Sequence, residues 1–122
     1  MTDSKDASSD RFGRSFRGYG ILVGLALFLV GVEVVLQLGD LGILDMPRFR
    51  NVAYENFGFW PGILSGWNAN YAAQPYTMFF SYAFLHGGLL HLVVNLITLW
   101  SLGRAVLERV RAPKFIMIYA LS

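Results

Sequence analysis

The apolar positions of this chain gather into long runs rather than into the one-sided stripes of soluble helices. The first run covers residues 18–38, GYGILVGLALFLVGVEVVLQL, and is 21 residues long. A helix needs about 20 apolar residues, at ~1.5 Å each, to cross a hydrocarbon layer of ~30 Å. The run therefore predicts a first transmembrane helix. A signal peptide is the alternative, but its apolar region covers about 7–15 residues and ends at a small-residue cleavage site, which this run lacks.

A second apolar run, residues 78–103, is also long enough to cross a membrane. It differs from the first run because it carries polar residues inside it, namely Ser81, His86, His91, Asn95, Thr98 and Ser101. A third run, residues 115–122, would cover only about 12 Å as a helix, so we expect the sequence to end inside a helix. The polar segment 1–17 predicts a short disordered tail, and the basic segment 104–114 predicts a short loop.

The connection between the two long runs, residues 39–77, is rich in both turn residues and aromatic residues. Its large apolar residues recur three or four positions apart: Phe49, Val52, Phe57, Trp60, Ile63, Leu64 and Trp67. This spacing predicts one short helix, or two helices broken near residues 58–62. Because Trp and Tyr gather at headgroup depth, we expect the loop to lie on or dip into the outer leaflet. Packing on a partner protein is the alternative, since interfaces also favour these residues.

Composition and charge agree with an all-α membrane protein. Apolar residues make up 55% of the chain and charged residues 15%, whereas a soluble domain carries about 25% charge. The absence of cysteine excludes disulfides, thiolate metal sites and cysteine nucleophiles. A pI near 9.2 would suit nucleic acid, but the basic residues flank the apolar runs, which favours a membrane and no nucleic-acid partner.

The distribution of the basic residues predicts the orientation in the membrane. Eight of the ten lie in the segments 1–17 and 104–114, and Arg48 and Arg50 lie in the long connection. Since cytoplasmic flanks carry the excess of Lys and Arg, we expect the N-terminus inside and the aromatic loop outside.

The second apolar run contains the candidate chemistry. His91 and Asn95 are four residues apart and share one face of a helix, whereas His86 would point about 140° away from His91. Gly87 and Gly88 give slack between the two histidines. Polar groups buried in hydrocarbon face a bundle interior or a water-filled cavity and mark function. The alternative is that His91 and Asn95 only form hydrogen bonds between helices. Two histidines five apart without a nearby carboxylate do not predict a metal site.

Two further polar features favour structural roles. Glu33 and Gln37 share a face of the first helix, where Glu33 is expected to reach the interface or bond to a neighbouring helix. Ser65, in the segment Gly62-Ile63-Leu64-Ser65-Gly66, resembles a serine-nucleophile turn only weakly. The motif is incomplete and no strand precedes it, so Ser65 is expected to be a loop serine.

From Gln74 onward the chain resembles the rhomboid family of intramembrane serine proteases. The family's second transmembrane helix has the pattern H-x-x-x-x-H-x-x-x-N, which His86, His91 and Asn95 match. The resemblance rests on Gln74-Pro75, the segment 81–88 (SYAFLHGG), the segment 91–95 (HLVVN), Leu102-Gly103, Glu108 and the stretch 115–119.

The resemblance implies a rhomboid-like polytopic bundle with a six-helix core. Residues 18–122 would hold its helices 1 and 2 and the start of helix 3, with the catalytic Ser and His expected downstream of Ser122. His91 and Asn95 would line the oxyanion hole. His86, bonded to the long loop or to water, and Glu108 would be supporting residues. No cofactor or metal is implied.

The chain departs from the family pattern in several places. The G-x-S-G nucleophile segment and the distant catalytic His are absent from residues 1–122. Tyr76-Thr77-Met78 stands where the family often has Trp-Arg, which puts that arginine's structural bonds in doubt. Arg111 stands where a helix-ending Gly is common.

The sequence therefore predicts a fragment of a rhomboid-type serine endopeptidase, inactive alone. The expected location is a bacterial inner membrane, and the expected partners are membrane-protein substrates and the lipid bilayer. The alternatives are a non-catalytic rhomboid-like protein that binds or scaffolds membrane proteins, and a genuine two-span membrane protein.

Overall fold

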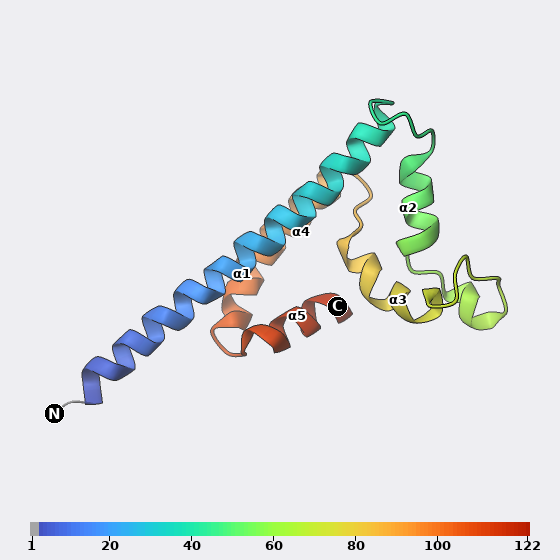
Figure 1. The fold of residues 1–122 in the computed structure, drawn as a ribbon. Helices are drawn as coiled ribbons and strands as arrows, with labels where there is room; N and C mark the ends of the chain where they lie inside the picture. The colour runs from blue at the N-terminus through green and yellow to red at the C-terminus, as the bar shows by residue number, and fades with distance from the viewer. Residues whose placement is uncertain (1–2) are drawn as a thin grey trace.

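The computed structural model describes residues 3–122, with side chains from Phe16 onward. This range is helical and contains no strand, which confirms the all-α class predicted from the sequence (Figure 1). The elements, in chain order, are α1 (Asp3–Asp40), α2 (Phe49–Phe57), the 3-10 helix η1 (Pro61–Ser65), α3 (Gln74–Ser81), the 3-10 helix η2 (Tyr82–Phe84), α4 (Leu89–Leu107) and α5 (Ala112–Leu121).

The core lies where α4 runs back along α1 and α5 packs beneath both helices (Figure 1). Its buried members are large apolar side chains, Leu22, Leu29, Leu92, Leu99 and Phe115. Gly103 permits the close approach of α4 to α1, because a Cβ at this position would lie 2.7 Å from Cδ2 of Leu22. Most of the remaining apolar side chains of the helices stay exposed, so this core is small for the apolar content of the chain.

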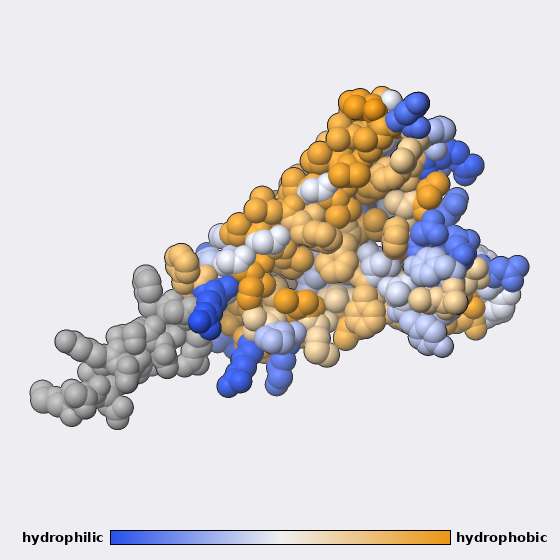
Figure 2. Space-filling model, viewed as in Figure 1, coloured by the Kyte–Doolittle hydropathy of each residue, from blue (hydrophilic) through white to orange (hydrophobic). Residues whose placement is uncertain are grey.

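Two helical segments, Phe16–Asp40 and Leu89–Leu107, are long and apolar enough to cross a membrane. Figure 2 shows apolar side chains along the coloured part of α1, with polar residues gathered at both ends of the apolar zone. Exposed apolar side chains on these helices include Val23, Leu27, Phe28, Val34, Val35, Leu90, Val93, Val94 and Ile97. Such surfaces suit lipid or further helices rather than water.

The helix boundaries correct two sequence-based expectations. α1 begins at Asp3, within the segment 1–17 expected to be a disordered tail. The segment contains no proline, and extending an existing helix costs less than starting a new one. The second apolar run is not one helix over 78–103, because α3 and η2 end before α4 begins at Leu89. Gly88, directly before α4, has φ 129° and ψ 177°. These angles lie outside the helical region, so α4 is separated from the helices before it.

The long connection forms two short helices, α2 and η1, broken near residues 58–62 as the apolar spacing predicted. Gly58 ends α2 and Pro61 begins η1. α2 turns back toward the end of α1. The loop expected over 104–114 is shorter than predicted, because α4 continues to Leu107 and α5 begins at Ala112.

Candidate functional site

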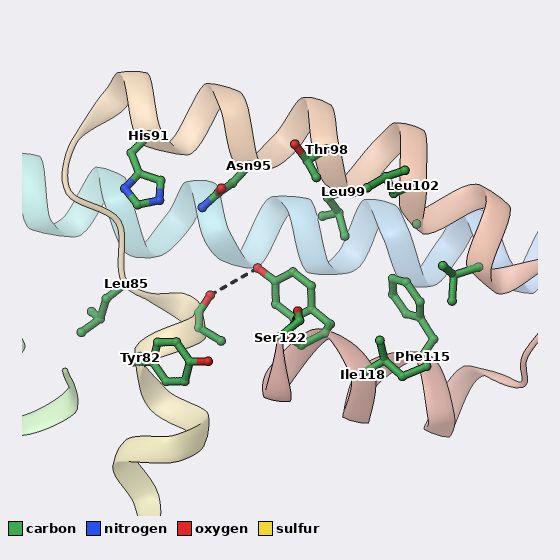
Figure 3. Close-up of a pocket in the computed structure, with 14 residues that line it drawn as sticks. Tyr82, Leu85, His91, Asn95, Thr98, Leu99, Leu102, Phe115, Ile118 and Ser122 are labelled. Atoms are coloured by element: carbon green, nitrogen blue, oxygen red, sulfur yellow. Dashed lines mark hydrogen bonds between the residues drawn. The ribbon is translucent and has the colours of Figure 1, made fainter. Parts of the chain in front are cut away.

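His91 and Asn95 lie on one face of α4 and line the same pocket (Figure 3). The pocket has a volume of about 520 Å³ and lies between α4, η2 and α5. Thr98, three residues beyond Asn95, continues the same polar row. The four-residue spacing thus places the imidazole and the amide on a common surface, as the sequence predicted.

The imidazole of His91 is exposed and the amide of Asn95 is half-buried. In the part of the chain that the structure describes, neither side chain bonds to another protein group, and both face the pocket. An imidazole N–H and an amide NH₂ are both hydrogen-bond donors. The pocket wall therefore presents two neighbouring donors that are free to bind an oxygen.

The opposite wall is held by a contact between α5 and η2. The hydroxyl of Tyr119 donates a hydrogen bond of 3.3 Å to the carbonyl of Ala83, drawn as a dashed line in Figure 3. The rings of Tyr119 and Phe84 also pack together, with centroids 6.1 Å apart. These contacts hold α5 against η2 and so fix the pocket wall opposite His91.

His86 lies directly before the entrance to α4, and its ring is buried, with 1% of the residue exposed. The ring centroid lies 5.7 Å from that of His91, with the ring planes at 86°. Both ring nitrogens lack a hydrogen-bond partner among the described residues. Burial lowers the pKa of His86 and the neighbouring His91 lowers it further, whereas the Glu33 carboxylate opposes the shift.

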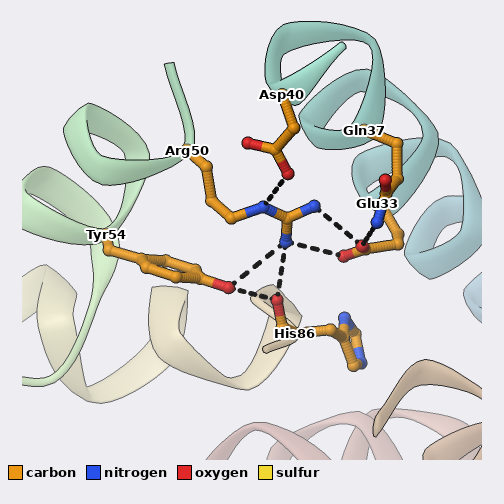
Figure 4. A network of polar contacts seen from close by, with 6 residues as sticks. All are labelled: Glu33, Gln37, Asp40, Arg50, Tyr54 and His86. Atoms are coloured by element: carbon orange, nitrogen blue, oxygen red, sulfur yellow. Dashed lines mark hydrogen bonds and ion pairs between the residues drawn. The ribbon is translucent and has the colours of Figure 1, made fainter. Parts of the chain in front are cut away.

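The guanidinium of Arg50 on α2 is the centre of a polar network at the Asp40 end of α1 (Figure 4). It bonds both carboxylate oxygens of Glu33, at 2.9 and 3.3 Å, and reaches Asp40 at 2.5 Å. Gln37 donates a further hydrogen bond of 3.0 Å to Glu33. The hydrogen bond to Glu33 raises the pKa of Arg50 above its ordinary value, so Arg50 stays charged. The structural role predicted for Glu33 is confirmed.

The same arginine connects the loop to the entrance of α4. Arg50 donates a hydrogen bond of 3.1 Å to the backbone carbonyl of His86, and the Tyr54 hydroxyl donates a second bond to this oxygen. His86 was expected to bond to the long loop or to water. It does bond to the loop, but through its carbonyl rather than through its ring.

Arg50 and Tyr54 were not identified as site residues from the sequence. The signal was present, because a carboxylate inside a membrane-spanning helix needs a cationic partner. Arg48 and Arg50 are the only basic residues in the connection that follows. Arg50 also supplies an arginine near this site from α2, whereas Tyr76-Thr77-Met78 stands where the family often has Trp-Arg.

The remaining candidates lie outside the pocket. Glu108 is exposed at the end of α4, where its backbone N–H bonds the Arg104 carbonyl. Ser65 ends η1 as an exposed loop residue, as expected. Among the described residues there is no group of three His, Cys, Asp or Glu that could hold a metal ion.

The comparisons with known proteins agree with the motif carried by this site. The family model described as Rhomboid domain matches residues 72–122, which include α3, η2, α4 and α5. Searches of curated proteins and of solved structures found no match for the chain. The matched segment contains His86, His91 and Asn95 in the spacing of the family's second transmembrane helix. This match over residues 72–122 supports a relationship of the chain to the rhomboid family.

Proposed function

We propose that this chain is part of an intramembrane serine endopeptidase of rhomboid type that cleaves membrane-protein substrates. The observation that carries the proposal is the shared pocket of His91 and Asn95, two free donors one helical turn apart. Residues 1–122 contain no G-x-S-G segment, so the nucleophile and the general base would come from chain beyond Ser122. Residues 1–122 alone are therefore expected to be inactive.

In this proposal, the two donors stabilise the tetrahedral intermediate of peptide hydrolysis. Attack of a serine on the scissile carbonyl places a negative charge on its oxygen. The Asn95 amide and a His91 ring N–H would donate hydrogen bonds to that oxygen. Donors fixed in advance in a site of low dielectric are effective, and loss of one typically lowers the rate by ~10²–10³. The reaction needs no metal or cofactor, because nucleophile, base and donors are all protein groups.

We place the protein in a bacterial inner membrane with its N-terminus in the cytoplasm. The excess of basic residues in the segments 1–17 and 104–114 supports this orientation. The His91 end of the pocket and the α2 loop then lie toward the outer half of the bilayer, since the Asp40 end of α1 faces outward. Substrates would reach the pocket from the membrane.

A non-catalytic rhomboid-like protein that binds or scaffolds membrane proteins is the second candidate. The observation that favours it is the lack of a nucleophile and a base within residues 1–122. The free donors of His91 and Asn95 favour the protease, because an oxyanion hole has no use without a nucleophile.

The test uses the full product of the reading frame, reconstituted in liposomes with a single-span substrate. Expected results are cleavage, labelling by a serine-reactive fluorophosphonate, and a fall in kcat of ~10²–10³ in Asn95→Ala and in His91→Ala. Ser101→Ala is the matched control, because its exposed hydroxyl bonds only backbone carbonyls of its own helix. Substrate binding without cleavage or labelling would refute the protease and support the scaffold.

A further inference from the structure

The entrance to α4 is a pair of glycines, and a residue of the site follows it within the first helical turn. Gly87 and Gly88 connect His86 to Leu89, and His91 follows two residues later. Gly88 has a φ of 129°, which side-chain-bearing residues rarely adopt. Two successive glycines leave the backbone many alternatives. The position of His86 relative to His91 therefore needs contacts from outside the segment.

Those contacts come from α2 and α1. The carbonyl of His86 accepts hydrogen bonds from both Arg50 and Tyr54. Arg50 is itself held by Glu33, whose side chain is fully buried on α1. His86, the last residue before the glycine pair, is thus held by Arg50, and Arg50 is held in turn by Glu33 of α1. Figure 4 shows the guanidinium lying between the Glu33 carboxylate and the His86 carbonyl.

The anchored residue contacts the proposed oxyanion site directly. The His86 ring packs edge-on against the His91 ring at a centroid distance of 5.7 Å. Gly87 leaves little free space beside the same ring, since an added Cβ there would lie 3.5 Å from Nδ1 of His91. Because the His91 ring makes no hydrogen bond within the described part of the chain, these packing contacts are what orient it.

We propose that Arg50 is a positioning residue of this site, which sets the orientation of the His91 ring through the carbonyl of His86. The inference rests on the proposed function for its catalytic consequence, but not for the orientation itself. A planar guanidinium can bond Glu33, Asp40 and His86 together, whereas a lysine ammonium at this position cannot reproduce the fork. Arg50→Lys keeps the positive charge and removes the forked arrangement of N–H donors.

The experiment compares three variants of the full product of the reading frame in the same membrane. Arg50→Lys disturbs the anchor. Tyr54→Phe removes the second donor to the His86 carbonyl together with the hydrogen bond that the Tyr54 hydroxyl accepts from Arg50. Arg48→Lys is the matched control. Arg48 lies two residues before Arg50, and its side chain is exposed and outside the network. Each protein is measured for thermal unfolding, for kcat and KM, and for the ¹⁵N resonance of the His91 ring, assigned by its loss in His91→Gln.

A displaced oxyanion donor lowers kcat rather than substrate binding, and a misplacement near 1 Å can lower rates by up to ~10²-fold. On that scale we expect Arg50→Lys to reduce kcat about 10-fold and Tyr54→Phe about 3-fold, with KM changed less than about twofold. The His91 resonance should shift or broaden in both, and Arg48→Lys should match the parent.

An unchanged His91 resonance and an unchanged kcat in a folded Arg50→Lys protein would overturn the inference. If Arg50→Lys does not fold, the Tyr54→Phe resonance decides, because this change touches no charge. A lower unfolding temperature with an unmoved resonance would indicate a purely structural role and would also overturn it. If the parent protein shows no cleavage, the proposed function fails, while the resonance still decides whether Arg50 positions His91.

Discussion

The ion pair between Glu33 and Arg50 gives the sharpest test of how this fold is held together. The Glu33 side chain is fully buried and that of Arg50 is 14% exposed. Glu33→Ala would leave Nη2 of the guanidinium without its hydrogen-bond partner, with Asp40 still bound to Nε. Removing one partner of a buried pair costs about 3–5 kcal/mol. Because Asp40 partly compensates, we expect a loss near the lower end, about 3 kcal/mol.

A double-mutant cycle separates the pair from its surroundings. Arg50→Met removes the charge and keeps the apolar stem, and it should also cost about 3 kcal/mol because it leaves Glu33 unpaired. The double variant has no buried unpaired charge. Its loss should fall below the sum of the two single losses by about 2 kcal/mol or more, within the range for residues in direct contact.

The assay is unfolding of the full product in mixed detergent micelles, followed by tryptophan fluorescence. Arg48→Ala is the control, since its 3.8 Å contact with Glu55 is largely exposed, and such surface pairs contribute about 0–1 kcal/mol. The reasoning would be refuted by a loss below about 1 kcal/mol in Glu33→Ala, or by single losses that add in the double variant.

Three further predictions concern the backbone and the pH dependence. Gly88→Ala should destabilise the protein by about 1–3 kcal/mol, because φ 129° suits glycine alone; equal unfolding of variant and parent would contradict this. Gly103→Leu should cost about 1–3 kcal/mol by overpacking, whereas Gly20→Leu, with no atom within 4 Å of its Cβ, should cost nothing; similar losses would contradict the packing argument. Because burial lowers the pKa of folded His86, stability should be full above the ordinary pKa of about 6.5 and fall as the pH drops below it. Unfolding at pH 7.5 and 5 measures this, and an equal fall in His86→Phe would disprove it.

The two helices that are long and apolar enough to cross a membrane could be predicted because their signal is local. Run length and apolar content along residues 18–38 suffice to identify such a helix, and α1 contains that run. The boundaries were less predictable. Residues 78–88 are rich in apolar side chains and lead directly into the apolar helix that follows, so hydropathy alone merges the end of α3, η2 and α4 into one run. The break depends on the conformation adopted at Gly88, which a glycine permits but does not require.

The candidate site likewise contains residues that local sequence patterns could place and residues that they could not. His91 and Asn95 could be placed on one face because helical periodicity relates them directly. Arg50 could not, because its contact with Glu33 crosses 17 residues and depends on how the chain reverses between α1 and α2. The bond from Arg50 to the His86 carbonyl crosses 36 residues. No local pattern encodes a contact to a backbone carbonyl, since every residue offers one.

The positions of the buried ion pair and of Gly88 bear on whether His91 and Asn95 form a site or only join helices. Polar residues that join membrane helices do so by hydrogen bonds to the neighbouring helix. In the described part of the chain, His91 and Asn95 instead face a pocket, although α1 and α5 are close enough to pack with α4. Arg50 of the buried ion pair bonds the carbonyl of His86, and the His86 ring packs on the His91 ring. Gly88, whose φ of 129° is rarely adopted by other residues, lies three residues before His91. Features that break local rules are expected where a structure holds a functional group in place, and here they meet at the entrance to α4. That convergence favours the site over interhelical bonding.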